Sequence, residues 1–243
     1  MQAARAGIAV AAAVVVAAVC VPAAGSAPAA PGPVAPSHAW IAHLVAPVEA
    51  RSAPAAGRLV TQLDALAPWN HGPVGLLVLA ARTGRDGQLW LRVRLPQRPN
   101  GAAAWIPSNR TRLTSTDWRI VVSVGRRTVA IEREGRVVHT YRAVVGKPAT
   151  PTPTGLFAVS ERISQPDPHG FYGPWVLLLT AYSNTLQHFD GGPGQISIHG
   201  RDGASMRDPL GSARSHGCIR IDNVGIELLA QVAVEGTPVT IER

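Results

Sequence analysis

The chain has 243 residues, of which 46% are hydrophobic and 16% are charged, a globular composition that excludes an intrinsically disordered protein. Its 24 glycines and 21 prolines favour short strands and turns and argue against a coiled coil or a helical bundle. The formal net charge is +8, and every basic residue except Lys147 is an arginine. A basic surface can face nucleic acid, anionic lipid or an acidic polymer such as a bacterial wall, so charge alone does not identify the partner.

The first 27 residues have the pattern of an export signal. Arg5 is followed by a long alanine- and valine-rich stretch without an acidic residue, lysine or arginine. Gly25 and Ala27 have the spacing that a signal peptidase requires, so we predict cleavage after Ala27 and an exported, extracytoplasmic protein. An uncleaved membrane anchor is the alternative. Lipid attachment at Cys20 is disfavoured, because the preceding valine is not small.

A proline- and alanine-rich linker over residues 28–39 precedes a predicted β module over residues 40–115. Within the module, residues 75–81 form a short apolar run, and residues 89–95 alternate apolar side chains with arginine. The Asp86-Gly87 pair between them is a hairpin signal. We therefore predict a small, β-rich first module, whose strand pattern resembles a bacterial SH3-like barrel.

The excess positive charge lies in this first module. Residues 40–115 contain nine arginines and three acidic residues, whereas residues 118–243 contain thirteen basic and eleven acidic residues. These arginines are most simply a solvated face, and attraction to an anionic wall polymer is the alternative interpretation. Nucleic acid is not expected as a partner because the export signal places the protein outside the cell.

A second module is predicted over residues 118–243, where apolar alternation, turn signals and one capped helical pattern follow one another. Asp222 has the character of an N-cap for the helix, which would end before Gly236. The predicted elements are a hairpin over 118–131, a third strand over 136–145, a loop stiffened by three prolines over 146–155, strands over 155–161 and 175–182 with a long loop over 164–173 between them, a helix over 223–234 and a closing strand over 237–242.

One thiol and two histidines lie close together in the second module. Removal of the signal would leave Cys218 as a lone cysteine in an exported chain, which excludes an intramolecular disulfide. A cysteine of ordinary pKa is only a few per cent thiolate at neutral pH, so thiol catalysis requires an activating group such as an imidazole. Either His199 or His216 could supply it, and the sequence spacing alone does not choose between them.

These residues form a recognisable pattern. His199 is followed by fifteen residues and then by Ser215-His216-Gly217-Cys218, with a proline loop over 150–155 upstream. The pattern resembles the L,D-transpeptidase (YkuD-type) catalytic domain and covers residues 118–243. The resemblance implies a β-sandwich-like catalytic domain with Cys218 as the nucleophile and His199 as the proton acceptor and donor. It also implies that the Gly200 carbonyl orients the imidazole.

The resemblance extends to the surrounding pocket. Ser215 and His216 are predicted to shape it, and the backbone N–H groups around His216, Gly217 and Cys218 are predicted to stabilise the oxyanion of the tetrahedral intermediate. Arg220 stands where one branch of the family has asparagine and is predicted to bind a carboxylate of the substrate. The loop over 164–173 is predicted to cover the site.

The implied reaction is the crosslinking of peptidoglycan stems. Cys218 would attack a tetrapeptide stem and release D-alanine, and the amine of a second stem would resolve the thioester into a 3→3 crosslink. Attack by water would instead make the protein an L,D-carboxypeptidase, and loss of catalysis would leave a wall-binding protein. A zinc site formed by His199, His216 and Cys218 lacks an evident fourth ligand. A papain-like arrangement would place the cysteine before the histidine. No cofactor and no metal are expected.

Overall fold

The structure is a computed structural model that describes residues 31, 32, 34, 35 and 37–243, so the predicted signal over 1–27 and part of the linker lie outside the described residues. The described chain is mainly β, as predicted, and contains one α-helix. None of its helices has the length and hydrophobicity needed to cross a membrane.

The first seven strands form one antiparallel sheet in the order β3-β2-β6-β5-β4-β1-β7. The strands of this N-terminal body are β1 (Ala39–Leu44), β2 (Val48–Arg51), β3 (Leu59–Leu63), β4 (Gly75–Thr83), β5 (Leu89–Arg94), β6 (Ala103–Pro107) and β7 (Thr111–Thr116), with a 3-10 turn, η1 (Ser108–Arg110), before the last. The predicted hairpin is present, because Thr83 pairs with Leu89 and Gly87 has a φ of 73°. The relation of this body to SH3-like barrels stays a prediction.

The remaining strands form the C-terminal body. Its main sheet has the order β10-β9-β8-β17-β12-β13-β14-β16, and β11 and β15 form a separate parallel pair. The strands are β8 (Trp118–Ser123), β9 (Thr128–Arg133), β10 (Arg136–Arg142), β11 (Val145–Gly146), β12 (Gly155–Ser164), β13 (Trp175–Tyr182), β14 (Gln195–His199), β15 (Ala213–Ser215), β16 (Ile219–Arg220) and β17 (Pro238–Glu242). The long predicted loop lies between β12 and β13. A 3-10 turn, η2 (Gly203–Arg207), follows β14.

The predicted third strand over 136–145 is wrong in one respect, because the structure divides it. β10 ends at Arg142, and Val144 then exchanges backbone hydrogen bonds with Arg220. Val145 begins β11 and is paired with Ala213 of β15. The chain therefore leaves the hairpin after Arg142, and its backbone groups form hydrogen bonds with segments about 70 residues away.

The helix α1 (Asn223–Val232) begins as predicted and ends two residues earlier than predicted. The Asp222 carboxylate accepts a hydrogen bond of 2.7 Å from the Gly225 N–H, which satisfies one of the N–H groups that a helix leaves without a partner at its first turn. The buried face of the helix includes Ile226 and Leu229.

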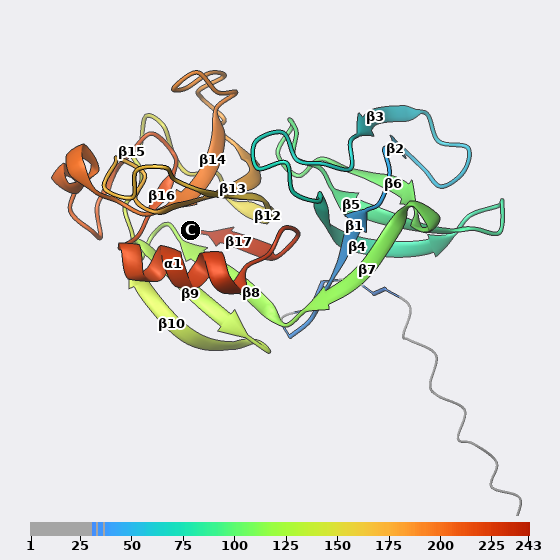
Figure 1. Ribbon diagram of the computed structural model, residues 1–243, viewed down its shortest axis with the longest axis horizontal. Helices are drawn as coiled ribbons and strands as arrows, with labels where there is room; N and C mark the ends of the chain where they lie inside the picture. Colours follow the sequence, from blue (N-terminus) through green and yellow to red (C-terminus); the bar gives the residue numbers. More distant parts are fainter. Residues whose placement is uncertain (1–30, 33, 36) are drawn as a thin grey trace, which may run out of the picture.

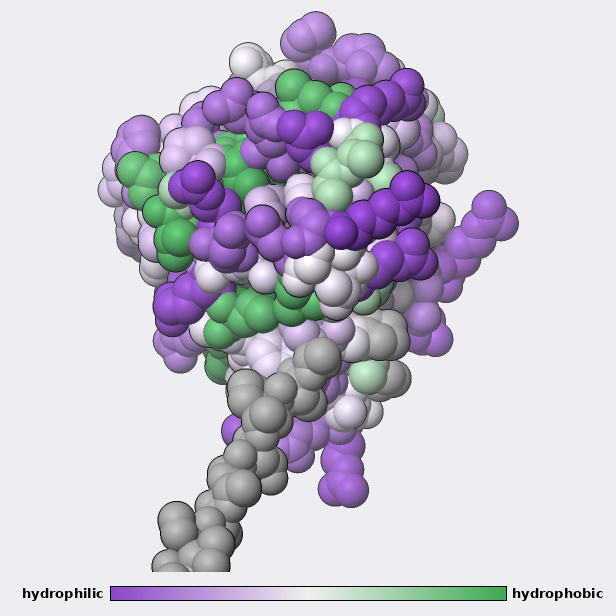
Figure 2. All heavy atoms as spheres, turned by 90° about the vertical axis from the view of Figure 1, so that its right-hand side faces the viewer, coloured by the Kyte–Doolittle hydropathy of each residue, from purple (hydrophilic) through white to green (hydrophobic). Residues whose placement is uncertain are grey.

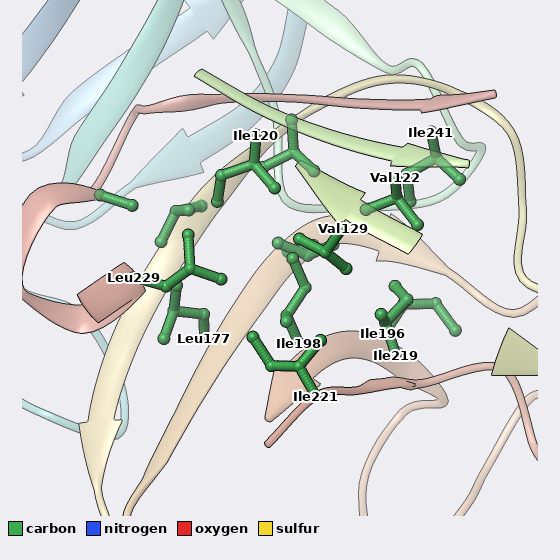
Figure 3. Packing of buried hydrophobic residues seen from close by; sticks show 14 of the residues in the cluster. Ile120, Val122, Val129, Leu177, Ile196, Ile198, Ile219, Ile221, Leu229 and Ile241 are labelled. Carbon is green, nitrogen blue, oxygen red and sulfur yellow. The ribbon is translucent and has the colours of Figure 1, made fainter. Parts of the chain in front are cut away.

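The C-terminal body has its own hydrophobic core. Buried residues from its strands and from α1 meet in one cluster, and Figure 3 shows side chains such as Ile120, Val129, Ile198 and Leu229 directed toward one another. The strands that lead to the predicted catalytic residues contribute to this cluster. Their positions are therefore fixed by the core rather than by surface loops.

The two bodies lie side by side (Figure 1), and they touch through a small apolar cluster of Ala39, Leu77 and Ala158. Polar contacts surround it. The Asn100 side chain donates to the Tyr182 carbonyl at 2.7 Å and accepts from the Tyr182 N–H at 2.8 Å. The Tyr182 hydroxyl donates to the Pro96 carbonyl at 2.7 Å. Segments of the N-terminal body thus hold the end of β13, from which a loop of the site departs.

Candidate functional site

Strand pairing brings the predicted nucleophile and the predicted proton acceptor together. β14 and β16 are parallel neighbours, with Ile198 opposite Ile219 and His199 opposite Arg220. Cys218 directly precedes β16, so its side chain lies next to the end of β14 that carries His199. Both residues line one groove with a volume of about 400 Å³.

The His199 imidazole is buried, with 1% of its surface exposed. Its Nδ1 lies 2.7 Å from the Gly200 carbonyl oxygen, which can only accept, so Nδ1 carries the proton of the neutral ring and Nε2 is left as the acceptor. Burial, helped by the positive charge of Arg220, lowers the pKa of His199 to about 3, and the backbone carbonyls of Gly200 and Tyr172 act in the opposite direction. The imidazole is therefore neutral near pH 7.

The Cys218 thiol is partly exposed and has a polar neighbour on the next strand. The Ser197 hydroxyl donates to Cys218 Sγ at 3.4 Å. Along β14, Ser197 and His199 are two residues apart and share one face, whereas Ile198 points into the core. The hydrogen bonds of the described residues do not include one between His199 and Cys218. Sequence reasoning gave Ser197 no role, although the period of two along the strand places it beside His199.

The turn that leads into Cys218 is held by its own side chains. The buried Ser215 hydroxyl donates to the Cys218 carbonyl at 2.6 Å and accepts from the Gly217 N–H at 3.1 Å. Gly217 has a φ of 123°, and a Cβ there would lie 2.9 Å from the Ile196 side chain, so only glycine fits. The Thr152 hydroxyl donates to the Gly217 carbonyl at 2.8 Å. The proline loop therefore directly supports the turn that leads into Cys218.

His216 lies at the rim of the groove. The Phe189 ring stacks on it with a centroid separation of 5.1 Å, and Lys147 Nζ lies 3.2 Å from its Nε2. Partial burial and the positive charges of Lys147 and Arg220 lower the pKa of His216. His216 is thus neutral near pH 7 and packs against aromatic surface.

Arg220 is almost fully buried and faces several groups at once. Its Nη1 donates to the Asp208 carboxylate at 2.8 Å, and its guanidinium lies 4.8 Å from the centre of the Phe171 ring. Its buried Nε has no hydrogen-bond partner in the described chain. Arg220 lines the groove, so a charged guanidinium lies in its wall, with one nitrogen already paired.

The loop between β12 and β13 lies against the site, where the sequence placed it. The Tyr172 ring is edge-on to His199 with a centroid separation of 5.0 Å, and the Phe171 ring is 6.0 Å away. The Tyr172 hydroxyl donates to the Asp190 carboxylate at 2.5 Å. Burial and the hydrogen bond to Asp190 raise the pKa of Tyr172. This hydrogen bond joins two loops that both line the groove.

Sequence reasoning missed the contribution of the N-terminal body. Trp69, in the connection between β3 and β4, lines the groove that contains Cys218. The Arg98 guanidinium donates to the carbonyls of Ser183, Leu186 and Pro193 at 2.6, 3.0 and 3.1 Å. These carbonyls belong to the loop that carries Phe189 and Asp190. Arg98 and its partners are 85 to 95 residues apart in sequence, so no local sequence pattern indicates these hydrogen bonds.

The predicted residues do not form a metal centre in this structure. Among residues 37–243 and the few described before them, no group of three or more histidine, cysteine, aspartate and glutamate side chains is arranged to hold an ion.

The family model and the curated relatives that match this chain indicate the same family. A family model described as the L,D-transpeptidase catalytic domain (YkuD) matches residues 117–241. Two curated relatives carry the name "Putative L,D-transpeptidase YkuD". The one from Bacillus subtilis is 36% identical over 126 residues, and the one from Bacillus licheniformis is 37% identical over 124 residues. The matches cover 52% and 51% of this chain and 66% and 65% of the relatives, so just under two thirds of each relative is spanned.

Several solved structures are also similar to this chain. A Bdellovibrio bacteriovorus protein, Bd1075, matches with 27% identity and a TM-score of 0.41, covering 52% of this chain and 48% of the other. L,D-transpeptidase 3 from Mycobacterium tuberculosis, in complex with a faropenem-derived adduct, matches with 15% identity and a TM-score of 0.43, covering 70% of this chain and 91% of the other. The family model alone matches half of the sequence, and through residues 117–241 the chain belongs to the L,D-transpeptidase catalytic domain family.

Proposed function

We propose that this protein is a peptidoglycan L,D-transpeptidase that forms 3→3 crosslinks through a thioester on Cys218. The observation that carries the proposal is that Cys218, which directly precedes β16, and His199 of the neighbouring strand β14 line one groove, within a chain of this family. Residues 118–243 are the proposed catalytic domain and residues 40–115 the proposed accessory module.

In the first half-reaction, the Cys218 thiol transfers its proton to His199 Nε2, and the sulfur attacks the carbonyl carbon that precedes the terminal D-alanine of a tetrapeptide stem. Collapse of the tetrahedral intermediate breaks the C–N bond and leaves a thioester. The same proton passes from His199 to the departing amine, and D-alanine is released. In the second half-reaction, an amine of another stem attacks the thioester, its proton moves through His199 to sulfur, and the C–S bond breaks.

The environment of His199 favours proton release. The lowered pKa keeps the ring neutral at neutral pH, so Nε2 has a free lone pair, and it also makes that nitrogen a weaker base than an ordinary histidine. Once protonated, the buried imidazolium is a strong acid and readily gives its proton to the leaving amine. The Gly200 carbonyl holds the ring through Nδ1 and so presents Nε2 as the reacting nitrogen.

The oxyanion requires N–H donors near Cys218. The Gly217 N–H already donates to the Ser215 hydroxyl, which favours the N–H groups of Cys218 and His216 as the donors. Each such donor contributes about 3 kcal/mol to catalysis. Ser215 has a supporting role, since its hydroxyl fixes the turn. Arg220 remains our proposed contact for a stem carboxylate, through the part of its guanidinium that Asp208 does not engage.

We propose an extracytoplasmic location at the cell wall, from the export pattern of residues 1–27 and from the family. Figure 2 views the molecule from the side of the N-terminal body, and mainly hydrophilic residues cover this face. The nine arginines among residues 40–115 make that body the proposed contact for an anionic wall polymer.

To test the proposal, the purified protein is incubated with a disaccharide tetrapeptide, and the products are identified from their intact masses. We expect a crosslinked dimer with loss of D-alanine for the unmodified protein and neither product for the Cys218→Ala and His199→Ala variants. His139→Ala, which changes an exposed histidine on β10, is the matched control and should keep activity. D-Alanine loss without dimer would assign a carboxypeptidase, and binding without turnover would assign a wall-binding protein.

A further inference from the structure

The groove that contains Cys218 continues into a second hollow on the molecular surface. Trp69 and Ile163 line both. The first part is lined by the catalytic candidates and by aromatic side chains of two loops. The second part lies beyond Trp69 and does not include Cys218 or His199 among its lining residues. The two hollows are therefore neighbours, and Trp69 and Ile163 contribute to the walls of both.

Trp69 is held firmly by its backbone while its side chain stays exposed. The Glu161 carboxylate, which is only 4% exposed, accepts from the N–H groups of Trp69 and Asn70, both at 3.0 Å. The Asn70 side chain donates to the Arg162 carbonyl at 3.1 Å and accepts from the Gly72 N–H at 2.7 Å. In contrast, the Trp69 side chain is 61% exposed. Packing in the core does not explain a large ring in this position.

The second hollow combines polar side chains with apolar and aromatic ones, among them Trp69, Ile163 and Trp175. Asn70, Arg162, Ser164 and Glu235 line it, and Arg162 pairs with Glu235 at 3.2 Å. A sugar ring presents a face of C–H groups and a rim of hydroxyls. An exposed indole with amide, guanidinium and carboxylate groups beside it complements both features.

We propose that this hollow binds the disaccharide of the donor strand, with a sugar ring stacked on Trp69. The inference rests on the proposed function, because a donor stem joins its sugar at one end and its scissile bond near the other. The order of the two hollows matches that order, with the peptide beside Cys218 and the sugar beyond Trp69. The N-terminal body thereby takes part in substrate recognition.

Direct binding tests the inference without catalysis. The full-length Cys218→Ala protein is titrated with peptidoglycan disaccharide that carries no peptide, and saturation-transfer NMR follows binding. We expect the further change Trp69→Ala to weaken binding by about fivefold, and Trp69→Phe to keep most of it. Leu59→Ala, at an exposed position on β3 of the same body, is the control and should bind normally. Equal binding with and without the indole, or no saturable binding by the starting protein, would overturn the inference.

Kinetics supply a second readout. With Trp69→Ala, we expect KM for a disaccharide tetrapeptide to rise about fivefold more than KM for the free tetrapeptide, with kcat affected little. An equal rise for both substrates would place Trp69 against the peptide and contradict the inference. If the unmodified protein releases no D-alanine from either substrate, the proposed function fails, and the binding experiment still decides the question of the sugar.

Discussion

The pKa of His199 gives the site a characteristic pH dependence. An unperturbed histidine titrates near pH 6.5, but burial and Arg220 lower the pKa of His199 to about 3. The neutral, proton-accepting ring therefore persists as the pH falls through 6. We expect the acid limb of kcat/KM to lie well below pH 6, measured as D-alanine release across pH 4 to 8.

The Arg220→Gln variant sharpens this prediction. It removes the positive charge that lowers the pKa of His199, so the acid limb should move toward higher pH whatever the change in absolute rate. An acid limb between pH 6 and 7 in the unmodified protein would contradict the assignment of a buried, neutral His199.

At the level of elements, the loop between β13 and β14 depends on the N-terminal body. Arg98 donates to three of its carbonyls, and the loop places Phe189 against His216 and Asp190 against Tyr172. We expect Arg98→Ala to reduce kcat/KM by about tenfold through misplacement of the groove wall. Amide hydrogen exchange of residues 183–194 should become faster in the same variant.

Arg92→Ala is the matched control, because Arg92 is an exposed arginine of the same body. It should change neither the exchange of the loop nor the activity. Loss of activity in Arg98→Ala without faster exchange would mean that Arg98 acts in some other way.

The sequence predicted most elements whose pattern is local. β13 was predicted with its observed bounds, and the start of α1 followed from the Asp222 cap. The division of the predicted third strand was missed, because Val144 and Val145 pair with residues near Arg220 and Ala213. Hydrophobic alternation indicates which face of a strand is buried. It does not indicate which distant strand will form backbone hydrogen bonds with it.

The same reason limits prediction of the site. The spacing between His199 and Cys218 was visible in the sequence, whereas the pairing of β14 with β16, which brings the two residues together, came from the structure. Trp69 and Arg98 were not selected, because their roles come from contacts with residues far along the chain. Trp69 stands in a turn-rich run, Pro68-Trp69-Asn70, and an aromatic residue in such a run was the one available signal.

At the level of the whole molecule, Glu161 joins the two bodies. This buried carboxylate of β12 accepts the N–H groups of Trp69 and Asn70. Glu161→Ala leaves both donors without that partner, so we expect the free energy of unfolding to fall by about 2 kcal/mol. Glu161→Gln keeps an acceptor and should cost less. Chemical denaturation measures both.

Glu227→Ala, at an exposed position of α1, is the reference for that measurement. It removes a glutamate without removing a buried acceptor and should leave the unfolding free energy nearly unchanged. A similar loss in Glu161→Ala and Glu227→Ala would show that the contact between the bodies contributes little to stability.

The contacts of Arg98 and Asn100 also determine how the protein can be divided into fragments. A fragment that begins at Asp117 would contain the whole region matched by the family model. It would nevertheless lose the donors that hold Ser183, Leu186 and Pro193, together with the side chain that pairs with the Tyr182 backbone. We therefore expect the smallest active unit of this protein to be larger than the region matched by the family model, and adding the separate N-terminal body back to such a fragment should restore its activity.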